Sequence, residues 1–131
     1  MKRNVLLHFK CLWAMLVISF IAFACKKDAA PNESKAYDPS EKVAVMDFFP
    51  KTGGGGQQFV IYGKNFGNDK SIVSVTIGGK RATVISVQDE AIYCIIPDRA
   101  YTGEIEVKVG TNANQQLAGA SEVFNYQKGW W

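Results

Sequence analysis

Histidine and cysteine are scarce in this sequence, which limits the chemistry that the chain can carry. The 131 residues include one histidine, His8, and three cysteines, Cys11, Cys25 and Cys94. Everything before Cys25 is predicted below to be removed, so the mature chain has no imidazole for a Ser/His or Cys/His nucleophile or for a zinc site. Cys94 alone falls in the presumed folded part, where it has no partner for an intramolecular disulfide. We therefore expect a protein that is not an enzyme, holds no cofactor or metal, and is stabilised by its core.

A basic surplus is also absent once the N-terminal segment is set aside. The whole chain has 15 Lys and Arg against 12 Asp and Glu, a formal net charge of +3. Three basic residues, Lys2, Arg3 and Lys10, lie in the segment predicted to be removed, which leaves 12 residues of each sign and a net charge of zero. Nucleic-acid binders gain most of their affinity by neutralising phosphates with a collected basic surface. The composition therefore predicts no nucleic-acid partner.

Residues 1–24 have the pattern of a signal peptide. A positively charged start is followed by an uncharged, mostly apolar run of 15 residues from Cys11 to Cys25. That run is short for a helix that crosses a bilayer, which needs about 20 apolar residues. The alternative, a single-pass anchor helix that begins at Val5, would bury His8 and Lys10 in the membrane at a substantial cost.

Ala22, Phe23 and Ala24 directly precede Cys25 and resemble the lipobox of bacterial lipoproteins. The resemblance implies that Cys25 becomes the mature N-terminus and carries a diacylglycerol and an amide-linked acyl chain, because several acyl chains hold a protein stably at a membrane. The sequence departs from the commonest lipobox at Ala22, where Leu is most frequent, and at Phe23. Cys25 is thus the predicted lipidation site and the membrane is a predicted partner.

Residues 25–42 are predicted to form the lipidated N-terminus and a flexible tether. The segment is polar, contains Pro31 and Pro39, and has neither helical nor strand periodicity. A flexible coil of this length reaches roughly 20 to 25 Å, which would keep a domain just above a membrane. Lys26, Lys27 and Asp28 resemble the charged signals that send some lipoproteins to the outer face of the outer membrane; the alternative is an ordinary solvated linker.

Short alternating runs separated by turn residues dominate the rest of the chain. The sequence predicts about seven strands, at 43–50, 59–62, 72–77, 80–87, 91–96, 104–109 and 122–126, with a flexible turn at 51–56 and a loop at 111–119. The run from Ile72 to Val87 is predicted to be a β-hairpin that turns at Gly78-Gly79, since glycine accepts the positive φ that a two-residue turn needs. Its core-facing residues are predicted to be Val73, Val75, Ile77, Ala82 and Val84. This pattern predicts an all-β, immunoglobulin-like sandwich.

A series of motifs occurs in order between Val45 and Tyr126. They are Phe49-Pro50, Gly53 to Gly56, Ile61 to Gly67, Val75 to Gly79, Ala82, Ile92 to Pro97, Gly103, Val107 and Phe124 to Tyr126. In this order and spacing they resemble the IPT/TIG domain, an immunoglobulin-like module of plexins, some transcription factors and many bacterial surface proteins. The resemblance implies such a domain over residues 43–127, followed by a tail at 128–131. It also implies that Ala82 stands where many members have a cysteine facing the position of Cys94, so Cys94 is expected to be a small buried hydrophobe.

Several polar clusters were considered as sites. Asp89-Glu90 and the pair Glu104 and Glu106 are the nearest approach to paired catalytic carboxylates, but the first lies in a predicted turn and the second on a predicted wet strand face. A calcium site is the alternative for the loop that carries three oxygen-bearing side chains, those of Asn65, Asn68 and Asp69, although the spacing matches no known calcium loop. No catalytic or metal-binding residue is assigned.

Aromatic residues are the better candidates for ligand binding. Exposed rings can stack on the faces of sugars, and the candidates are Tyr62, Phe66, Tyr93 and Tyr101. Core or rim packing is the alternative for each, and Phe66 in particular could fold back under the sheet. Trp130 and Trp131 would expose a large apolar area at the end of the chain.

Together these features predict a non-enzymatic, lipid-anchored module at the outer membrane, with the cell surface favoured over the periplasmic face. It would act as a spacer or interaction domain in polysaccharide capture, with a glycan or an outer-membrane protein as partner. The alternatives are a module that itself binds glycan and an accessory domain of a carbohydrate-active enzyme. The chain is expected to be either a stand-alone module or the N-terminal fragment of a longer protein.

Overall fold

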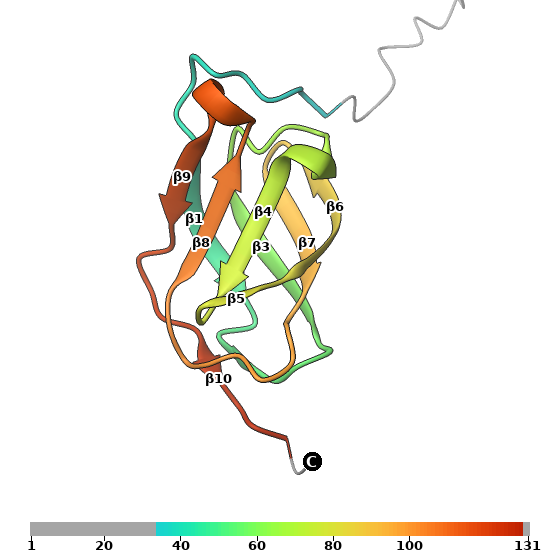
Figure 1. Ribbon diagram of the computed structural model, residues 1–131, viewed down its shortest axis with the longest axis vertical. Helices are drawn as coiled ribbons and strands as arrows, with labels where there is room; N and C mark the ends of the chain where they lie inside the picture. The colour runs from blue at the N-terminus through green and yellow to red at the C-terminus, as the bar shows by residue number, and fades with distance from the viewer. Residues whose placement is uncertain (1–33, 130–131) are drawn as a thin grey trace, which may run out of the picture. The chain divides into compact units, whose positions relative to one another are not determined.

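Two four-stranded antiparallel sheets make up the body of the protein in the computed structural model, which describes residues 34–129 (Figure 1). The first sheet has the order β1-β3-β7-β6, formed by Ala44–Phe49, Gln58–Lys64, Ala91–Ile95 and Thr83–Gln88. The second has the order β5-β4-β8-β9, formed by Lys80–Arg81, Val73–Ile77, Ile105–Val109 and Gln116–Gly119. The predicted all-β, immunoglobulin-like sandwich is confirmed.

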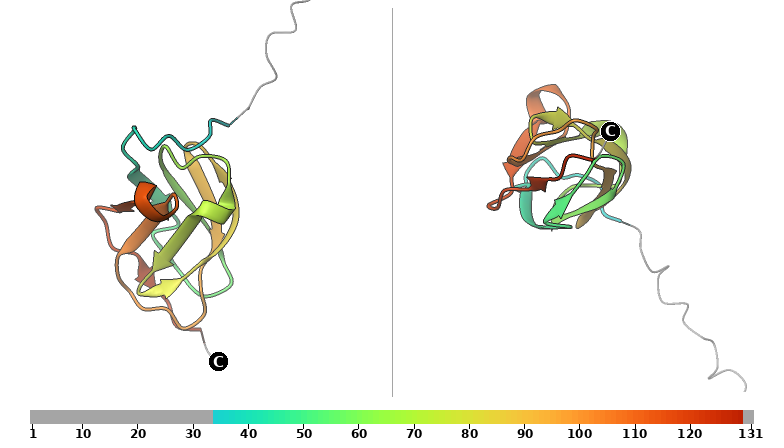
Figure 2. Two further views of the ribbon diagram at one scale, coloured as in Figure 1. Left: turned by 45° about the horizontal axis from the view of Figure 1, so that its top comes forward. Right: turned by 90° about the horizontal axis from the view of Figure 1, so that it is seen from below.

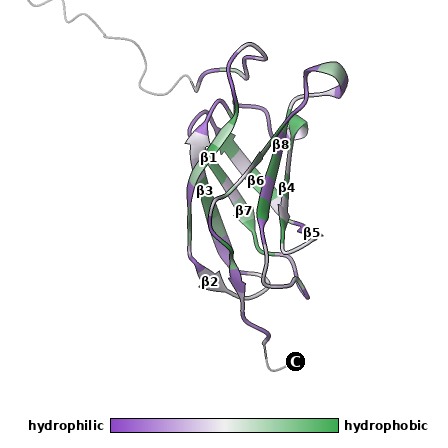
Figure 3. Ribbon diagram, turned by 90° about the vertical axis from the view of Figure 1, so that its left-hand side faces the viewer, coloured by the Kyte–Doolittle hydropathy of each residue, from purple (hydrophilic) through white to green (hydrophobic). Residues whose placement is uncertain are grey.

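Alternation of apolar and polar residues builds the core between the sheets. In β4 the side chains of Val73, Val75 and Ile77 are buried, and Ser74 and Thr76 between them are half-buried. The strands of both layers carry most of the hydrophobic positions in Figure 3. Each aliphatic or aromatic side chain removed from water in this way contributes about 1.5–3 kcal/mol. With no disulfide in residues 34–129, this packing holds the sandwich together.

Three phenylalanines form the aromatic centre of the core. The ring of Phe59 stacks on that of Phe48 at a centroid distance of 5.5 Å and meets the edge of Phe124 at 5.3 Å. All three side chains are at most 1% exposed. Phe124 comes from the end of the chain, beyond β9, and so joins the C-terminal segment to the first sheet.

The predicted hairpin from Ile72 to Val87 is correct at its turn and wrong in its second strand. Gly78 and Gly79 have φ of 54° and 80°, as a two-residue turn requires, and Ile77 pairs with Lys80. After Arg81, however, the chain leaves β4 and crosses to the first sheet, where Thr83 pairs with Ile95. Both strands still turn one face towards the core between the sheets. Val73, Val75, Ile77 and Ala82 are therefore buried as predicted, and Val84 is half-buried against the same core.

Two segments predicted to be turns or loops contain short strands. Residues 111–119 include the 3₁₀ helix η2 (Asn112–Asn114) and β9, which pairs with β8. The predicted turn at 51–56 contains β2 (Thr52–Gly53), which pairs in parallel with β10 (Asn125–Tyr126). A second 3₁₀ helix, η1 (Lys70–Ile72), precedes β4. The described residues thus hold ten strands where about seven were predicted, because β2 and β9 were predicted as turn and loop and the predicted strand at 80–87 is divided into β5 and β6.

Part of the predicted flexible tether is bound to the domain. Residues 34–43, the N-terminal strap, run across one pole of the sandwich beside η2 (Figures 1 and 2). The Asn65 side chain, at the end of β3, accepts the Asp38 N–H at 2.9 Å and donates to the carbonyls of Asp38 and Glu41. Gln116, at the start of β9, accepts the Val43 N–H and donates to Glu41. The prediction of a tether is therefore wrong for residues 34–42.

Tyr37 completes the attachment of the strap. Its hydroxyl donates to the Asn114 carbonyl at 2.5 Å, and its ring and backbone lie against Gly67 and Gly110. A Cβ added at Gly67 would come within 2.7 Å of the Tyr37 nitrogen, and one added at Gly110 within 2.9 Å of its ring. These glycines are required for close approach of the strap, a role that gives no periodic signal in the sequence.

Several predictions concern residues outside the described range. These are the signal peptide at 1–24, lipidation of Cys25, the Lys26-Lys27-Asp28 signal and the tryptophans Trp130 and Trp131. No helix among residues 34–129 has the length and hydrophobicity needed to cross a bilayer.

Candidate functional site

The side chains of the candidate calcium loop, Asn65, Asn68 and Asp69, form hydrogen bonds to backbone groups. The Asn65 side chain is 3% exposed and uses its oxygen and nitrogen on the N-terminal strap. Asn68 donates to the Ser34 carbonyl, and Asp69 accepts the Ser71 N–H to cap η1. That cap holds the pKa of Asp69 below its usual value, since hydrogen bonds from Ser71 favour the ionised carboxyl. The three side chains thus have structural roles.

The two carboxylate pairs lie on opposite sheets. Asp89 and Glu90 form the turn between β6 and β7, where their carbonyls accept the N–H groups of Phe66 and Gly63 at 3.0 Å. Glu104 is exposed and Glu106 half-buried, and both border an open depression of about 250 Å³ on the second sheet. No group of three His, Cys, Asp or Glu side chains suited to a metal occurs in residues 34–129.

Cys94 is buried in the core, as predicted. Its side chain lies in β7 opposite Val84 and is 0% exposed. Burial raises the pKa of the Cys94 thiol to about 12, because the thiolate would lose its hydration. A protonated, enclosed thiol is neither a nucleophile nor a metal ligand at neutral pH.

The four candidate aromatic residues separate into three groups. Phe66 is 0% exposed and folds back under the first sheet, which removes it from any binding surface. Tyr62 and Tyr93 lie on the outer face of that sheet and are 46% and 37% exposed. Tyr101 is 65% exposed and belongs to the segment between β7 and β8, which runs past the pole opposite the N-terminal strap (Figure 1).

Tyr62 and Tyr93 belong to an apolar surface that crosses all four strands of the first sheet. Phe49 pairs with Val60, Val60 with Tyr93, and Tyr93 with Ser86, so these residues form one outward row. Tyr62 is two residues from Val60 and shares its face. The bulge at Val84/Ser86 adds Ile85, which is 46% exposed. We call this surface, formed by Phe49, Val60, Tyr62, Ile85 and Tyr93, the tyrosine face.

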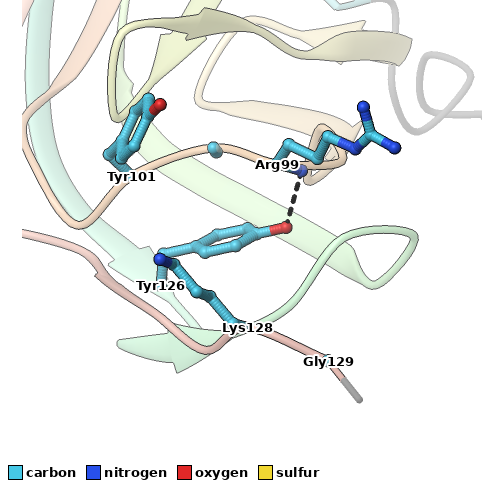
Figure 4. A pocket seen from close by; sticks show the side chains of 6 residues that line it. Arg99, Tyr101, Tyr126, Lys128 and Gly129 are labelled. Carbon is cyan, nitrogen blue, oxygen red and sulfur yellow. Dashed lines mark hydrogen bonds between the residues drawn. The ribbon is translucent and has the colours of Figure 1, made fainter. Parts of the chain in front are cut away.

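A pocket of about 280 Å³ opens at the pole that carries Tyr101 (Figure 4). Its walls come from the 99–101 segment after β7 and from β10 with the residues that follow it, and they consist of Arg99, Ala100, Tyr101, Tyr126, Lys128 and Gly129. The Arg99 N–H donates to the Tyr126 hydroxyl at 2.9 Å, and the Tyr126 N–H donates to Thr102 Oγ1 at 2.8 Å. We call this the polar-end pocket.

Sequence reasoning found Tyr101 but missed the other members of the polar-end pocket. Arg99 follows Pro97-Asp98, which in the sequence indicates only the end of a strand. Tyr126 and Lys128 lie more than 25 positions further along the chain. No local motif connects them, because their proximity depends on the pairing of β10 with β2.

The IPT/TIG domain family matches residues 44–126, most of the described chain. This chain belongs to the IPT/TIG domain family. No curated protein is significantly similar to it.

Solved structures of Bacteroides proteins are similar to this chain over part of their length. A Bacteroides thetaiotaomicron protein described as a candidate phosphatase is 49% identical with a TM-score of 0.69, over 71% of this chain and 20% of that one. An auxiliary nutrient binding protein from Bacteroides ovatus is 39% identical with a TM-score of 0.64, over 71% and 22%. One of the same description from B. thetaiotaomicron is 36% identical with a TM-score of 0.66, over 70% and 22%. The chain thus spans about a fifth of the length of each.

Proposed function

We propose that this IPT/TIG domain is a non-enzymatic, lipid-anchored module of the outer-membrane surface that acts as a spacer or interaction domain in polysaccharide capture. Cys25 would carry the lipid, as its lipobox-like context indicates, and the mature chain would have no nucleic-acid partner. Similarity to two Bacteroides proteins named as auxiliary nutrient binding proteins supports a role in the uptake of nutrients. The similarity covers about a fifth of the length of each of these proteins.

The spacer role is supported by the positions of residues 34–43 and 127–129, which lie at opposite poles of the sandwich (Figure 1). The N-terminal strap is fixed to one pole of the sandwich by Asn65 and Gln116, and residues 127–129 leave from the opposite pole (Figure 1). Strands of five to seven residues, at about 3.3 Å per residue, separate the poles. A module held at one end therefore presents whatever lies at its other end roughly 20 Å further from the membrane.

The anchor can be tested by substitution and cell fractionation. Cys25→Ala should move the protein from the membrane to the soluble fraction, and the parent should incorporate a labelled fatty acid that the variant does not. Cys11→Ala, a cysteine in the predicted apolar run of the signal peptide, is the matched control and should behave like the parent. If Cys25→Ala remains membrane-bound, the lipid anchor is wrong, and an intact mass that includes residues 1–24 would identify the helix anchor instead.

The tyrosine face supports a second candidate function, direct binding of glycan. Two tyrosines and a phenylalanine are exposed on one sheet face, and aromatic rings offer flat apolar surfaces with polar edges that suit sugars. Affinity electrophoresis on a panel of neutral polysaccharides would test it. Retardation that disappears in Tyr62→Ala/Tyr93→Ala would support this function, and an unretarded parent on every polysaccharide would count against it.

A further inference from the structure

The polar-end pocket combines two cations with two aromatic rings. Arg99 and Tyr101 come from one segment and Tyr126 and Lys128 from another, and all four line the same pocket (Figure 4). No Asp or Glu lines it. We infer that this pocket binds the carboxylate group of an acidic sugar, with the sugar ring against Tyr101.

The positive charge is concentrated at the pocket, so an anion should bind there in preference to the rest of the domain surface. Residues 34–129 contain ten basic and ten acidic residues, so the domain as a whole does not attract anions. The ion pairs within those residues join Lys35 to Glu41 and Lys51 to Asp47 and Glu122, and they leave Arg99 and Lys128 without a carboxylate. Two unpaired cations beside one opening favour an anion, and a guanidinium can grip a carboxylate with two parallel hydrogen bonds.

The wall of the pocket is held in place before any ligand arrives. Arg99 has a φ of 56°, and this left-handed conformation directs its N–H to the Tyr126 hydroxyl. The backbone beside Tyr126 is fixed by hydrogen bonds to Thr102 Oγ1 and, through the Gln127 N–H, to the Gly53 carbonyl at 2.8 Å. Because the Tyr126 ring is already oriented, less conformational entropy is lost on binding.

A hydrogen-bond donor remains available on this fixed wall. The Tyr126 hydroxyl acts as an acceptor towards Arg99, and within residues 34–129 its own proton makes no hydrogen bond. A phenolic hydroxyl both donates and accepts, so Tyr126 can donate to a ligand oxygen while it stays bound to Arg99. Arg99, Lys128 and Tyr126 would thus supply the polar contacts.

Size and polarity favour a sugar unit over a bare ion. At about 280 Å³ the pocket lies near the lower end of small-molecule sites, roughly 300–1,000 Å³, and far exceeds the space that one small anion needs. Tyr101, 65% exposed, offers an apolar surface to the carbon–hydrogen face of a sugar ring. The choice of a sugar as the carrier of the carboxylate rests on the proposed role in polysaccharide capture.

The test uses the full chain in detergent micelles and isothermal titration calorimetry. The probes are a tetramer of galacturonic acid, the neutral galactose tetramer and sodium sulfate. The parent should bind the uronate saturably, bind the neutral tetramer at least tenfold more weakly, and lose uronate affinity as salt is added. Sulfate should bind more weakly than the uronate, because it cannot use Tyr101.

Single substitutions test whether the uronate binds in the polar-end pocket. Arg99→Gln keeps the backbone N–H that holds Tyr126 and should weaken uronate binding about tenfold. Tyr101→Ala should also weaken uronate binding, by a smaller factor. Lys108→Gln removes an exposed cation on β8 and is the matched control, expected to stay within twofold of the parent. Tyr62→Ala/Tyr93→Ala should also be unchanged, which separates the pocket from the tyrosine face.

Three outcomes would overturn the inference. They are no saturable uronate binding, equal binding of the neutral tetramer, and unchanged affinity in Arg99→Gln. Sulfate binding as tight as uronate binding would reduce the site to an adventitious ion site and would also overturn it. None of these results depends on membrane attachment. If the parent does not bind the uronate but Cys25→Ala moves to the soluble fraction, the proposed uronate site is wrong and the proposed lipid-anchored module is retained.

Discussion

The side chain of Asn65 and the backbone of Asp38 hold each other through two hydrogen bonds. Asn65 Oδ1 accepts the Asp38 N–H at 2.9 Å, and Asn65 Nδ2 donates to the Asp38 carbonyl at 2.7 Å. Asn65 is buried and has a φ of 60°, a conformation that asparagine tolerates better than most residues. One side chain thereby fixes the N-terminal strap to the end of β3.

Asn65→Gly should release the strap without straining the backbone. Glycine accepts the same φ, so the loss of about 2 kcal/mol of unfolding free energy comes from the lost hydrogen bonds. Hydrogen exchange of residues 35–43, followed by mass spectrometry, should become much faster than in the parent. Asn68→Ala, which removes one exposed hydrogen bond to Ser34, is the control and should change little. Unchanged exchange in Asn65→Gly would show that the strap is held by other contacts.

Gly78→Ala should destabilise the domain more than Gly79→Ala. Both residues have positive φ, so a Cβ costs about 1 kcal/mol at either position. At Gly79 the added Cβ meets open space, but at Gly78 it would collide with the Tyr101 carbonyl. In urea unfolding, the free energy of unfolding of Gly78→Ala should therefore be at least about 1 kcal/mol lower than that of Gly79→Ala. Equal stabilities would mean that the 99–103 segment is not packed against the turn.

Stability should decrease in alkali because of Cys94. The pKa of its thiol is raised in the folded protein to about 12 from 9.0, so above pH 9 the unfolded chain loses this proton while the folded protein keeps it. The contribution of the protonated Cys94 thiol to the free energy of unfolding is complete below pH 9. Between pH 9 and pH 12 it should decrease by about 1.4 kcal/mol per pH unit. Cys94→Ala, which costs about 1 kcal/mol at pH 7 through a small cavity, should lack this part of the slope. Parallel profiles of unfolding free energy against pH for parent and variant would contradict the burial of a neutral thiol.

A charge at Val75 should unfold the domain. The Val75 side chain is 0% exposed between the sheets, and an unpaired carboxylate there costs several kcal/mol. Ser74→Asp places the same charge on the opposite, half-buried face of β4 and should remain folded. Circular dichroism melting distinguishes the two variants. A Val75→Asp protein that melts like the parent would require a different register for β4.

The sandwich was predictable because its main strands alternate strictly. The triplets Val73, Val75, Ile77 in β4 and Ile105, Val107, Val109 in β8 show the period of two, and all six side chains are buried. The register of their pairing, Val75 opposite Val107, completes the second sheet. The turn at Gly78-Gly79 was also visible, because few residues accept its backbone conformation.

Other parts depend on contacts that no local pattern records. In β9 the residues Gln116 to Gly119 lack an apolar alternation, since this edge strand is held mainly by backbone pairing with β8. The N-terminal strap is held by amide side chains from two different sheets, so its polar sequence looks like that of a free linker. The polar-end pocket joins Arg99 to Lys128, which lie far apart in the sequence and meet only in the folded domain.

Surface exposure of the anchored domain is the most direct test of the proposed function. An antibody against the folded domain would be applied to intact and to permeabilised Gram-negative cells that produce either the parent or Cys25→Ala. The lipid-anchored surface module predicts equal labelling of the parent in both preparations and loss of surface labelling in the variant. Labelling of the parent only after permeabilisation would contradict it and place the domain on the periplasmic side.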